Sequence, residues 1–347
     1  MGLNPLSMSA TSHSLPDQFP LPPPGRTGWP WTEASPPLSP TRSDGSLWPR
    51  VSVVTPSFNQ APYLEETIRS VLLQGYPNLE YIVMDGGSTD GSVEIIRRYA
   101  DWVAAWVSER DAGQADAINK GFRHASGEIL AWLNSDDIFY PGAVQAQVKY
   151  LIERPTVEVV YGDCQYVSAH GQPVQTAYAR PFAPRELLRF TLMYQPTVFF
   201  RRAAMERSGP LDAGFQFALD AEYWLRLHRN GARFGYHPAL VATYRLHDSS
   251  KTIGSVTKMH AETERLIVQY ASPGERVGLL ADHYLQTAIR LVNQGQTRSS
   301  WAYARAACAL RVRIRLLAYL GAVFDQVTGL PLYRSMLGVW LRLKSRV

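Results

Sequence analysis

Two adjacent carboxylates, Asp136 and Asp137, directly follow an apolar run of sequence, residues 128–133. An apolar run that ends in acids is typical of a buried strand delivering carboxylates to the carboxyl edge of an α/β sheet, where such sheets bind ligands. Two neighbouring carboxylates repel one another unless a cation lies between them or one is protonated. A divalent metal that carries a phosphate is therefore the functional interpretation. The structural alternative is a solvated turn before Tyr140-Pro141-Gly142.

The sequence around this pair alternates between short apolar strands and helices. Strands are expected at Val51–Thr55, Tyr81–Met84, Trp102–Val107 and residues 128–133, with helices between them. This alternation predicts a mostly parallel sheet with right-handed crossovers. Three of the strands lead in turn to Asp85, Asp111 and Asp136, which predicts one acidic, ligand-facing edge.

The second half of the chain predicts a different arrangement. Short strands of mixed direction are expected at Val157–Tyr161, Thr197–Arg201, Arg233–Tyr236 and Leu240–Arg245, with a helix at Leu219–Arg229. The Pro/Ser-rich residues 1–48 are expected to be a disordered arm, or one draped over the domain and anchored by Trp29-Pro30-Trp31. The predicted organisation is thus an arm at 1–48, an α/β domain at 49–254 and a basic helical region at 255–347.

Composition limits the compartment. The chain has 347 residues, of which 46% are hydrophobic and 19% charged, enough for a substantial core. Cys164 and Cys308 give no disulfide framework and fit a reducing compartment. The N-terminus lacks the features of a signal peptide, and no apolar run reaches the ~18 residues that span a bilayer. A cytoplasmic protein is expected.

The positive charge lies at the C-terminal end. From Trp301 onward there are eight basic residues and one acid, a net charge of +7. Residues 1–300 carry a net charge of −2, which gives +5 for the whole chain. A basic tail with aromatic residues suggests contact with an anionic membrane surface, as in a peripheral protein, or a helical cap on the domain. Nucleic acid is not an expected partner, because the basic residues do not form a patch on the motif-bearing core.

At these residues the chain resembles the inverting family 2 glycosyltransferases of the GT-A fold, over about residues 51–252. The ordered landmarks are residues 53–59, 84–90, 119–121, 134–137, 162–163 and 219–227. The resemblance implies an α/β GT-A fold with a mixed, mostly parallel central sheet and a C-terminal helical region.

Six residues are implied on the nucleotide side, namely Thr55, Pro56, Asp85, Asp111, Asn119 and Asn134. Thr55 and Pro56 end the first strand, where the family's backbone lines the nucleotide pocket. Asp85 would accept a hydrogen bond from the base, with capping of the following helix as the structural alternative. Asp111 and Asn119 would lie near the base and ribose, or serve as turn and helix-start residues.

The resemblance also implies a divalent metal cofactor, Mn²⁺ or Mg²⁺. Asp136 would bridge it to the donor diphosphate, and Asp137 would be a second ligand or act through water. His247 would bind the metal or phosphate, with a structural role as the alternative. Two positions depart from the family's pattern. Asn134, on the nucleotide side, stands where the family often has Asp, and Gly86 also stands where the family often has Asp. The first departure leaves fewer carboxylates for the metal and so implies weaker metal binding, and the second leaves nucleotide recognition more dependent on Asp85.

Asp220 is implied as the catalytic base that takes the proton of the acceptor hydroxyl. Its structural alternative is the N-cap of the helix that follows, and Glu222 is the second choice of base. Gln195 resembles the family's acceptor-side segment, with a turn before an apolar strand as the structural alternative. Arg245 and Lys251 would neutralise the diphosphate.

The predicted function is therefore inverting transfer of a sugar from a nucleotide-diphosphate donor, a UDP-sugar, to a glycan or lipid-linked acceptor. One alternative is a nucleotidyltransferase, which usually has a basic, Gly-rich loop after the first strand. Residues 56–60 contain neither Lys nor Arg. The other alternative is a non-catalytic, membrane-associated protein that binds sugar nucleotides.

Overall fold

The computed structural model describes residues 15–189, 191–247, 256–310 and 323. Lys251 and most of the basic tail lie outside the described residues. The chain forms two compact units. The sheet unit comprises residues 1–179, 193–210 and 232–245, and the helical unit comprises 180–192, 211–231 and 246–347.

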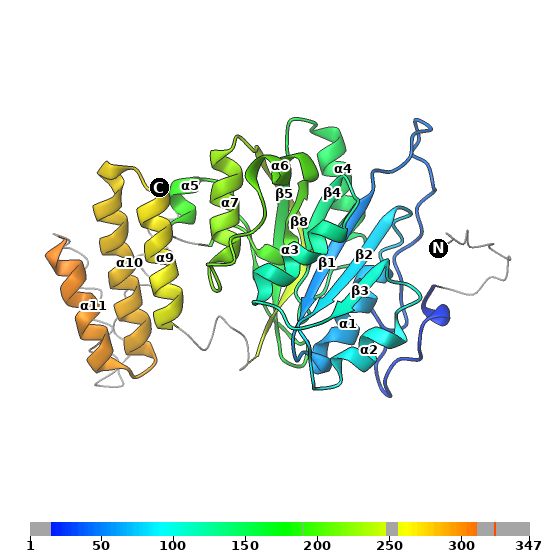
Figure 1. Ribbon diagram of the computed structural model, residues 1–347, viewed down its shortest axis with the longest axis horizontal. Coiled ribbons are helices and arrows are strands. Elements are labelled where there is room, and N and C mark those ends of the chain that lie inside the picture. Colours follow the sequence, from blue (N-terminus) through cyan, green and yellow to red (C-terminus); the bar gives the residue numbers. More distant parts are fainter. Residues whose placement is uncertain (1–14, 190, 248–255, 311–322, 324–347) are drawn as a thin grey trace. The chain divides into compact units, whose positions relative to one another are not determined.

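One sheet forms the centre of the sheet unit (Figure 1). Its described strands run in the order β3-β2-β1-β4-β7-β5-β6, and β8 pairs with β5. β1 pairs in parallel with β2 and β4, β2 pairs in parallel with β3, and the pairs β4–β7, β5–β7 and β5–β6 are antiparallel. The bounds are β1 (Val51–Ser57), β2 (Leu79–Asp85), β3 (Ala105–Ser108), β4 (Ile129–Trp132), β5 (Val159–Ser168), β6 (Pro173–Ala177), β7 (Phe199–Arg201) and β8 (Phe234–Leu246). The prediction of a mixed, mostly parallel sheet is confirmed.

Helices cover both faces of the sheet. The helices of the sheet unit are α1 (Ala61–Leu72), α2 (Ser92–Arg98), α3 (Gln114–His124), α4 (Ala143–Glu153) and α6 (Arg202–Ser208), with 3-10 turns η1 (Leu15–Gln18) and η2 (Gln195–Thr197). Val51 and Val53 of β1 belong to the core cluster that includes residues of α1, α2 and α4. Val54 points to the other face, where a Cβ on Gly121 of α3 would collide with its methyl groups. Alternate residues of β1 thus bury against opposite layers.

Several predicted strands differ from those observed; β5, for example, continues to Ser168 rather than ending at Tyr161. β1 continues through Pro56 to Ser57, because β4 stops pairing at Val54 and the missing N–H of Pro56 faces no strand on that side. Thr55 and Pro56 therefore do not end the strand. The two strands expected at 233–236 and 240–245 form the single strand β8, which tolerates Pro238 and lies off the main strand path. β6 was not predicted, because most of its residues are exposed and lack an apolar alternation.

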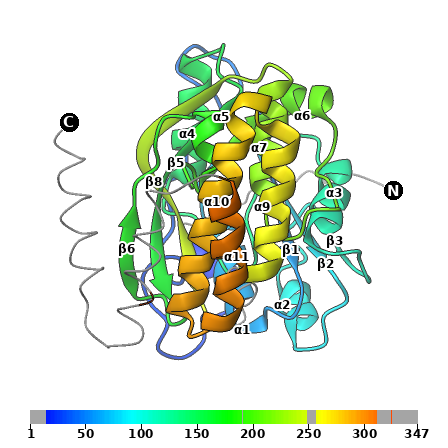
Figure 2. The same ribbon diagram turned by 90° about the vertical axis from the view of Figure 1, so that its left-hand side faces the viewer.

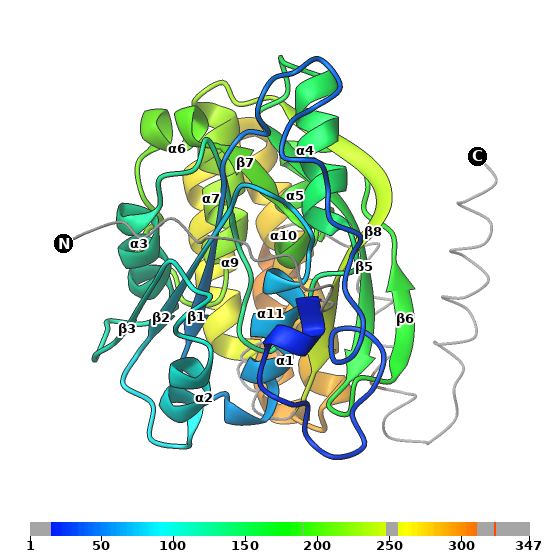
Figure 3. The ribbon, with the colours of Figure 1, turned by 90° about the vertical axis from the view of Figure 1, so that its right-hand side faces the viewer.

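The arm before β1 lies along α1 and α4 over residues 19–48, in dark blue in Figure 3. The buried guanidinium of Arg69 donates to the carbonyl oxygens of Pro20, Pro30 and Trp31. Trp29 Nε1 donates to the Phe139 carbonyl at 2.8 Å, two residues after the acidic pair. The arm thus braces the loop that follows β4 from behind.

The helical unit contains three long helices packed side by side, shown in yellow to orange in Figure 2. Its described helices are α5 (Pro184–Leu187), α7 (Leu219–Arg229), α9 (Val256–Tyr270), α10 (Pro273–Asn293) and α11 (Thr297–Ala309). The observed bounds of α7 match the predicted helix. In the described part of the chain, no helix is both long and apolar enough to cross a membrane.

Candidate active site

The loops after β1 and β2 are joined by hydrogen bonds into one rim at the carboxyl edge of the sheet. Gly86 N donates to Ser57 O at 2.8 Å, and Asn59 N donates to Ser88 Oγ at 2.8 Å. Asn59 has a φ of 52°, a left-handed conformation that asparagine tolerates. These bonds fix the position of the rim before any ligand arrives.

Asp85, at the end of β2, is buried, with 3% of its surface exposed. Its carboxylate accepts four hydrogen bonds, from Gly87 N, from Ser88 N and Oγ, and from Ser108 Oγ. Asp90 is the residue that accepts from the backbone at the helix starts, because it takes Ala61 N and Ser92 N. Asp85 therefore organises the rim. A nucleotide base that reached Asp85 would have to donate to a carboxylate oxygen that already accepts hydrogen bonds from the protein.

Asp111 comes closest to the rim at Gly86. A Cβ on Gly86 would lie 2.7 Å from Asp111 Oδ2 and 3.2 Å from Phe58 Cδ2, while Asp111 Oδ1 accepts from Gly113 N. An aspartate in place of Gly86 would require Asp111 to move. Phe58 is 60% exposed and offers an aromatic face at this edge. The sequence-based prediction did not include Phe58, although an aromatic residue within the first landmark, residues 53–59, is visible in the sequence.

Two other nucleotide-side predictions fall on regular elements. Thr55 is buried, and its Oγ1 accepts from Tyr81 OH at 3.0 Å. Asn119 lies inside α3, well past its first turn. The helix-start alternative for Asn119 is therefore wrong.

A network of amides holds the loop after β4. Asn134 Nδ2 donates to Gln195 Oε1 at 2.9 Å, and Asn134 Oδ1 accepts from Gln114 Nε2 at 2.7 Å. Gln195 Nε2 donates in turn to the Trp132 carbonyl. Asn134 and Gln195, predicted on different sides of the site, therefore contact one another. Gln114 is a third member that the sequence did not reveal.

The acidic pair is asymmetric. Asp137 is 2% exposed, and its Oδ1 accepts from the backbone N–H of Arg245 at 2.9 Å. Burial, and then the neighbouring charge of Asp136, raise the pKa of the Asp137 carboxyl well above its usual range. Asp136 is only partly buried. Asp136 is thus the member better placed to meet a ligand from solvent.

Arg245, near the end of β8, clasps this loop. Its Nε donates to the Asp136 carbonyl and its Nη2 to Glu66 Oε2, both at 2.8 Å, and its side chain is 2% exposed. Its guanidinium also lies 5.1 Å from the ring centroid of Tyr63. Glu66 and Tyr63, both on α1, carry no motif and were missed. The Arg245 guanidinium, predicted to neutralise the diphosphate, therefore donates to oxygens of the protein itself.

Asp220 is the second residue of α7, in the helical unit, and Ala218 is the N-cap. The N-cap alternative for Asp220 is therefore wrong. Its Oδ1 accepts from Ala221 N at 2.8 Å. Although the side chain is partly exposed, burial of the carboxyl raises the pKa of Asp220.

Glu222, the second choice of base, is 1% exposed. It accepts from Arg226 Nε at 2.8 Å and from Tyr270 OH at 2.7 Å. This engagement favours Asp220 over Glu222 as a base.

The described residues contain no cluster of three or more His, Cys, Asp or Glu arranged around a metal position. The donor chemistry nevertheless fits a hard divalent cation, since Mg²⁺ is usually bound by one or two carboxylates with the remaining ligands from phosphate and water. Asp136 supplies such a carboxylate, and the repulsion between it and Asp137 would be relieved by a cation. His247, the residue after β8, is buried, and Lys251 lies outside the described residues.

The family comparison matches the chain to Glycosyl transferase family 2 over residues 52–215. A relative from Bacillus subtilis, the glycosyltransferase TuaG named for teichuronic acid biosynthesis, is 30% identical over 244 residues, which cover 64% of this chain and 95% of the relative. An uncharacterized glycosyltransferase of Rickettsia typhi is 27% identical over 213 residues, covering 59% of this chain. The chain spans just under two thirds of that relative, 66% of its length.

Solved structures of similar fold include a mannosyltransferase from Pyrobaculum calidifontis in complex with GDP-Man and Mn²⁺. It is 24% identical, with a TM-score of 0.56 over 88% of this chain and 85% of that one. TarS from S. aureus in complex with UDP-GlcNAc is 16% identical, with a TM-score of 0.54 over 80% of this chain and 89% of that one. These likenesses confirm the predicted fold class.

Proposed function

The chain belongs to glycosyl transferase family 2, and we propose that it transfers a sugar from a UDP-sugar to a hydroxyl of a glycan or lipid-linked acceptor with inversion. The observation that carries this proposal is Asp220. Its carboxyl is desolvated, its pKa is raised, and one oxygen is held by the backbone of its own helix. A carboxylate with a raised pKa is a stronger base than an ordinary aspartate.

Similar proteins support a nucleotide-sugar donor and a polysaccharide product. The two solved structures hold GDP-Man and UDP-GlcNAc, and the Bacillus subtilis relative is named for teichuronic acid biosynthesis. On the sheet unit, Phe58 and Asp111 at the rim offer a stacking face and a hydrogen-bond acceptor to the base and ribose. Asp85 would join them by sharing its bonded oxygens.

In the proposed reaction, Asp220 accepts the proton of the acceptor hydroxyl as that oxygen bonds to the anomeric carbon. The bond from this carbon to the diphosphate oxygen breaks, and the nucleoside diphosphate leaves with the bonding electrons. Asp136 would hold a divalent cation, Mn²⁺ or Mg²⁺, with Asp137 and His247 as further candidate ligands. The cation, when bound, supplies charge neutralisation to the departing diphosphate.

Substitution separates the two roles. Asp220→Asn removes the base and should lower kcat for transfer by roughly 10²–10⁴-fold while leaving donor binding intact. Asp136→Ala should instead weaken binding of Mn²⁺ and UDP, measured by isothermal titration calorimetry. The exposed Asp101→Asn is the matched control and should change neither. A screen for hydrolysis of UDP- and GDP-sugars in the presence of Mn²⁺ or Mg²⁺ identifies the sugar donor.

The pH profile gives a second reading of Asp220. A base must be deprotonated, so kcat should be lost as the pH falls through the raised pKa of Asp220, at a higher pH than for an ordinary aspartate. The residual activity of Asp220→Asn should lack this acid limb. Undiminished transfer by Asp220→Asn would show that another group is the base.

We also propose peripheral attachment of the basic tail to anionic membrane, which would suit a lipid-linked acceptor. The charge of residues 301–347 is the supporting observation. Flotation with liposomes containing an anionic lipid tests it, and equal flotation of the full chain and a truncation before Trp301 contradicts it.

A further inference from the structure

Helix α9 contributes a buried carboxylate to the segment that leads into α7. Glu262 of α9 is 9% exposed. Its Oε1 accepts from Gln216 N at 2.8 Å, and its Oε2 accepts from Phe217 N at 2.7 Å and Ala218 N at 2.9 Å. One side chain thus fixes three consecutive backbone N–H groups. Asp220 lies two residues further on.

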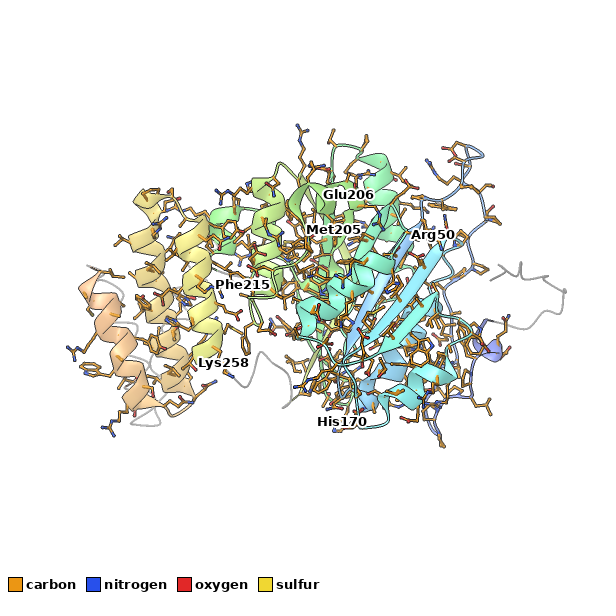
Figure 4. All side chains as sticks on the ribbon, in the orientation of Figure 1. Arg50, His170, Met205, Glu206, Phe215 and Lys258 are labelled. Atoms are coloured by element: carbon orange, nitrogen blue, oxygen red, sulfur yellow. The ribbon has the colours of Figure 1, made fainter. Side chains whose placement is uncertain are left out.

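Two more residues of α9 hold the same region. Arg265 Nη1 donates to Gly214 O at 2.9 Å, and its guanidinium stacks 4.1 Å from the ring centroid of Phe215, which is labelled in Figure 4. Tyr270 OH donates to Glu222 Oε1 at 2.7 Å. Contacts from α9 therefore reach both sides of Asp220 along the chain.

The start of α7 depends on these contacts from outside. Its N-cap is Ala218, which has no side-chain oxygen to accept from the helix backbone. Glu262 places a negative charge at this helix start, where the helix dipole favours one. Through these three hydrogen bonds Glu262 restrains the backbone that leads to Asp220.

We propose that Glu262, on the face of α9 that also carries Arg265 and Tyr270, is a positioning residue for the catalytic base. The proposal rests on the proposed role of Asp220. α9 begins at Val256, beyond the residues 52–215 that match the family and outside the α/β domain expected from the sequence. The surface of α9 toward α7 therefore serves the reaction.

Glu262→Gln tests the proposal, because the amide keeps the size of the side chain but replaces one acceptor oxygen with a donor. The expected result is a kcat for transfer lowered roughly tenfold to a hundredfold, the range that a small misplacement of a catalytic group produces. The dissociation constant for UDP with Mn²⁺ should stay within about twofold, since a misplaced base leaves donor binding intact. Glu264→Gln on the same helix is the matched control, because Glu264 accepts from Tyr284 OH and touches none of these backbone groups.

A double substitution distinguishes positioning from general destabilisation. If Glu262 acts through Asp220, Glu262→Gln should lower kcat no further in an Asp220→Asn background. A multiplicative loss, or a Glu262→Gln kcat equal to that of Glu264→Gln in folded protein, overturns the inference. Transfer that survives Asp220→Asn alone would instead overturn the proposed base, so the two failures are distinct.

A milder pair of variants covers the case in which Glu262→Gln does not fold. Tyr270→Phe removes the hydroxyl that bonds Glu222, two residues after Asp220, and Tyr284→Phe removes the corresponding bond to Glu264. A severalfold drop in kcat for Tyr270→Phe and none for Tyr284→Phe supports the role of α9. Equal kcat values for the two variants contradict it.

Discussion

The ion pair between Glu66 and Arg245 lies directly behind the acidic loop and should be worth far more than a surface ion pair. The Arg245 side chain is 2% exposed and that of Glu66 is 13% exposed, with 2.8 Å between Nη2 and Oε2. Glu66→Gln would leave a buried guanidinium without its carboxylate. Breaking one partner of such a pair costs about 3–5 kcal/mol.

The lower end of that range is expected here. Arg245 keeps its bonds to the carbonyl oxygens of Asp136 and Ala169, and a glutamine can still accept one hydrogen bond. We therefore expect Glu66→Gln to lower the free energy of unfolding by about 3 kcal/mol, and Arg245→Met by a similar amount. Because the double variant leaves no buried charge unpaired, the coupling energy should be about 2 kcal/mol or more.

Urea denaturation of the two single variants and the double variant measures this coupling, and calorimetry with UDP and Mn²⁺ measures the consequence for the site. Arg245 fixes the backbone at Asp136, so both single variants should weaken the binding of Mn²⁺ and UDP. A coupling below about 0.5 kcal/mol, the value for exposed pairs, would refute the buried clasp. If Arg245→Met weakens the binding of UDP and Mn²⁺ and Glu66→Gln does not, Arg245 contacts the diphosphate directly, as expected from the sequence.

Two further predictions concern stability. In the helical unit, His260 and His283 stack with ring centroids 4.3 Å apart, and burial lowers the pKa of each to about 4. In the unfolded chain both histidines bind a proton near pH 6.5, so the free energy of unfolding should fall as the pH drops below 6.5, by about 1–2 kcal/mol at pH 5.5. Urea denaturation measures this pH dependence. His260→Gln should reduce it, and His170→Gln, an exposed control labelled in Figure 4, should keep it. In the sheet unit, Gly121→Ala should cost about 1–3 kcal/mol in the same assay, because its Cβ would overlap Val54, and Val54→Ala should restore part of the loss.

Local periodicity explains why much of the fold could be predicted. The bounds of α7 follow from packing residues such as Trp224 and Leu227 at helical spacing, and these are buried as expected. The position of the acidic pair follows from the apolar run before it, since β4 ends at Trp132. β6 could not be predicted in this way, because its pairing with β5 stabilises residues that remain largely exposed.

Contacts between distant residues explain why the site could be predicted only in part. Asn134 and Gln195 are 61 residues apart, and Glu262 is 44 residues from Ala218. Each pair meets only when separate elements pack, and neither amides nor a single glutamate carry a local pattern. The chemistry expected of Arg245 was that of a free cation, and only the fold shows Glu66 beside it.

The place of Asp220 in α7 explains why a base at a helix start needs help from another helix. The N-terminus of a helix favours the charged form of a carboxylate, which would weaken it as a base, and an aspartate there tends to act as a cap. Here burial is the larger effect, because the pKa of Asp220 is raised despite its bond to Ala221 N. Glu262 takes up the backbone donors before the helix and adds negative charge there. With these backbone donors engaged by Glu262, Asp220 is not needed as the cap of α7, and its carboxyl can serve as the proposed base.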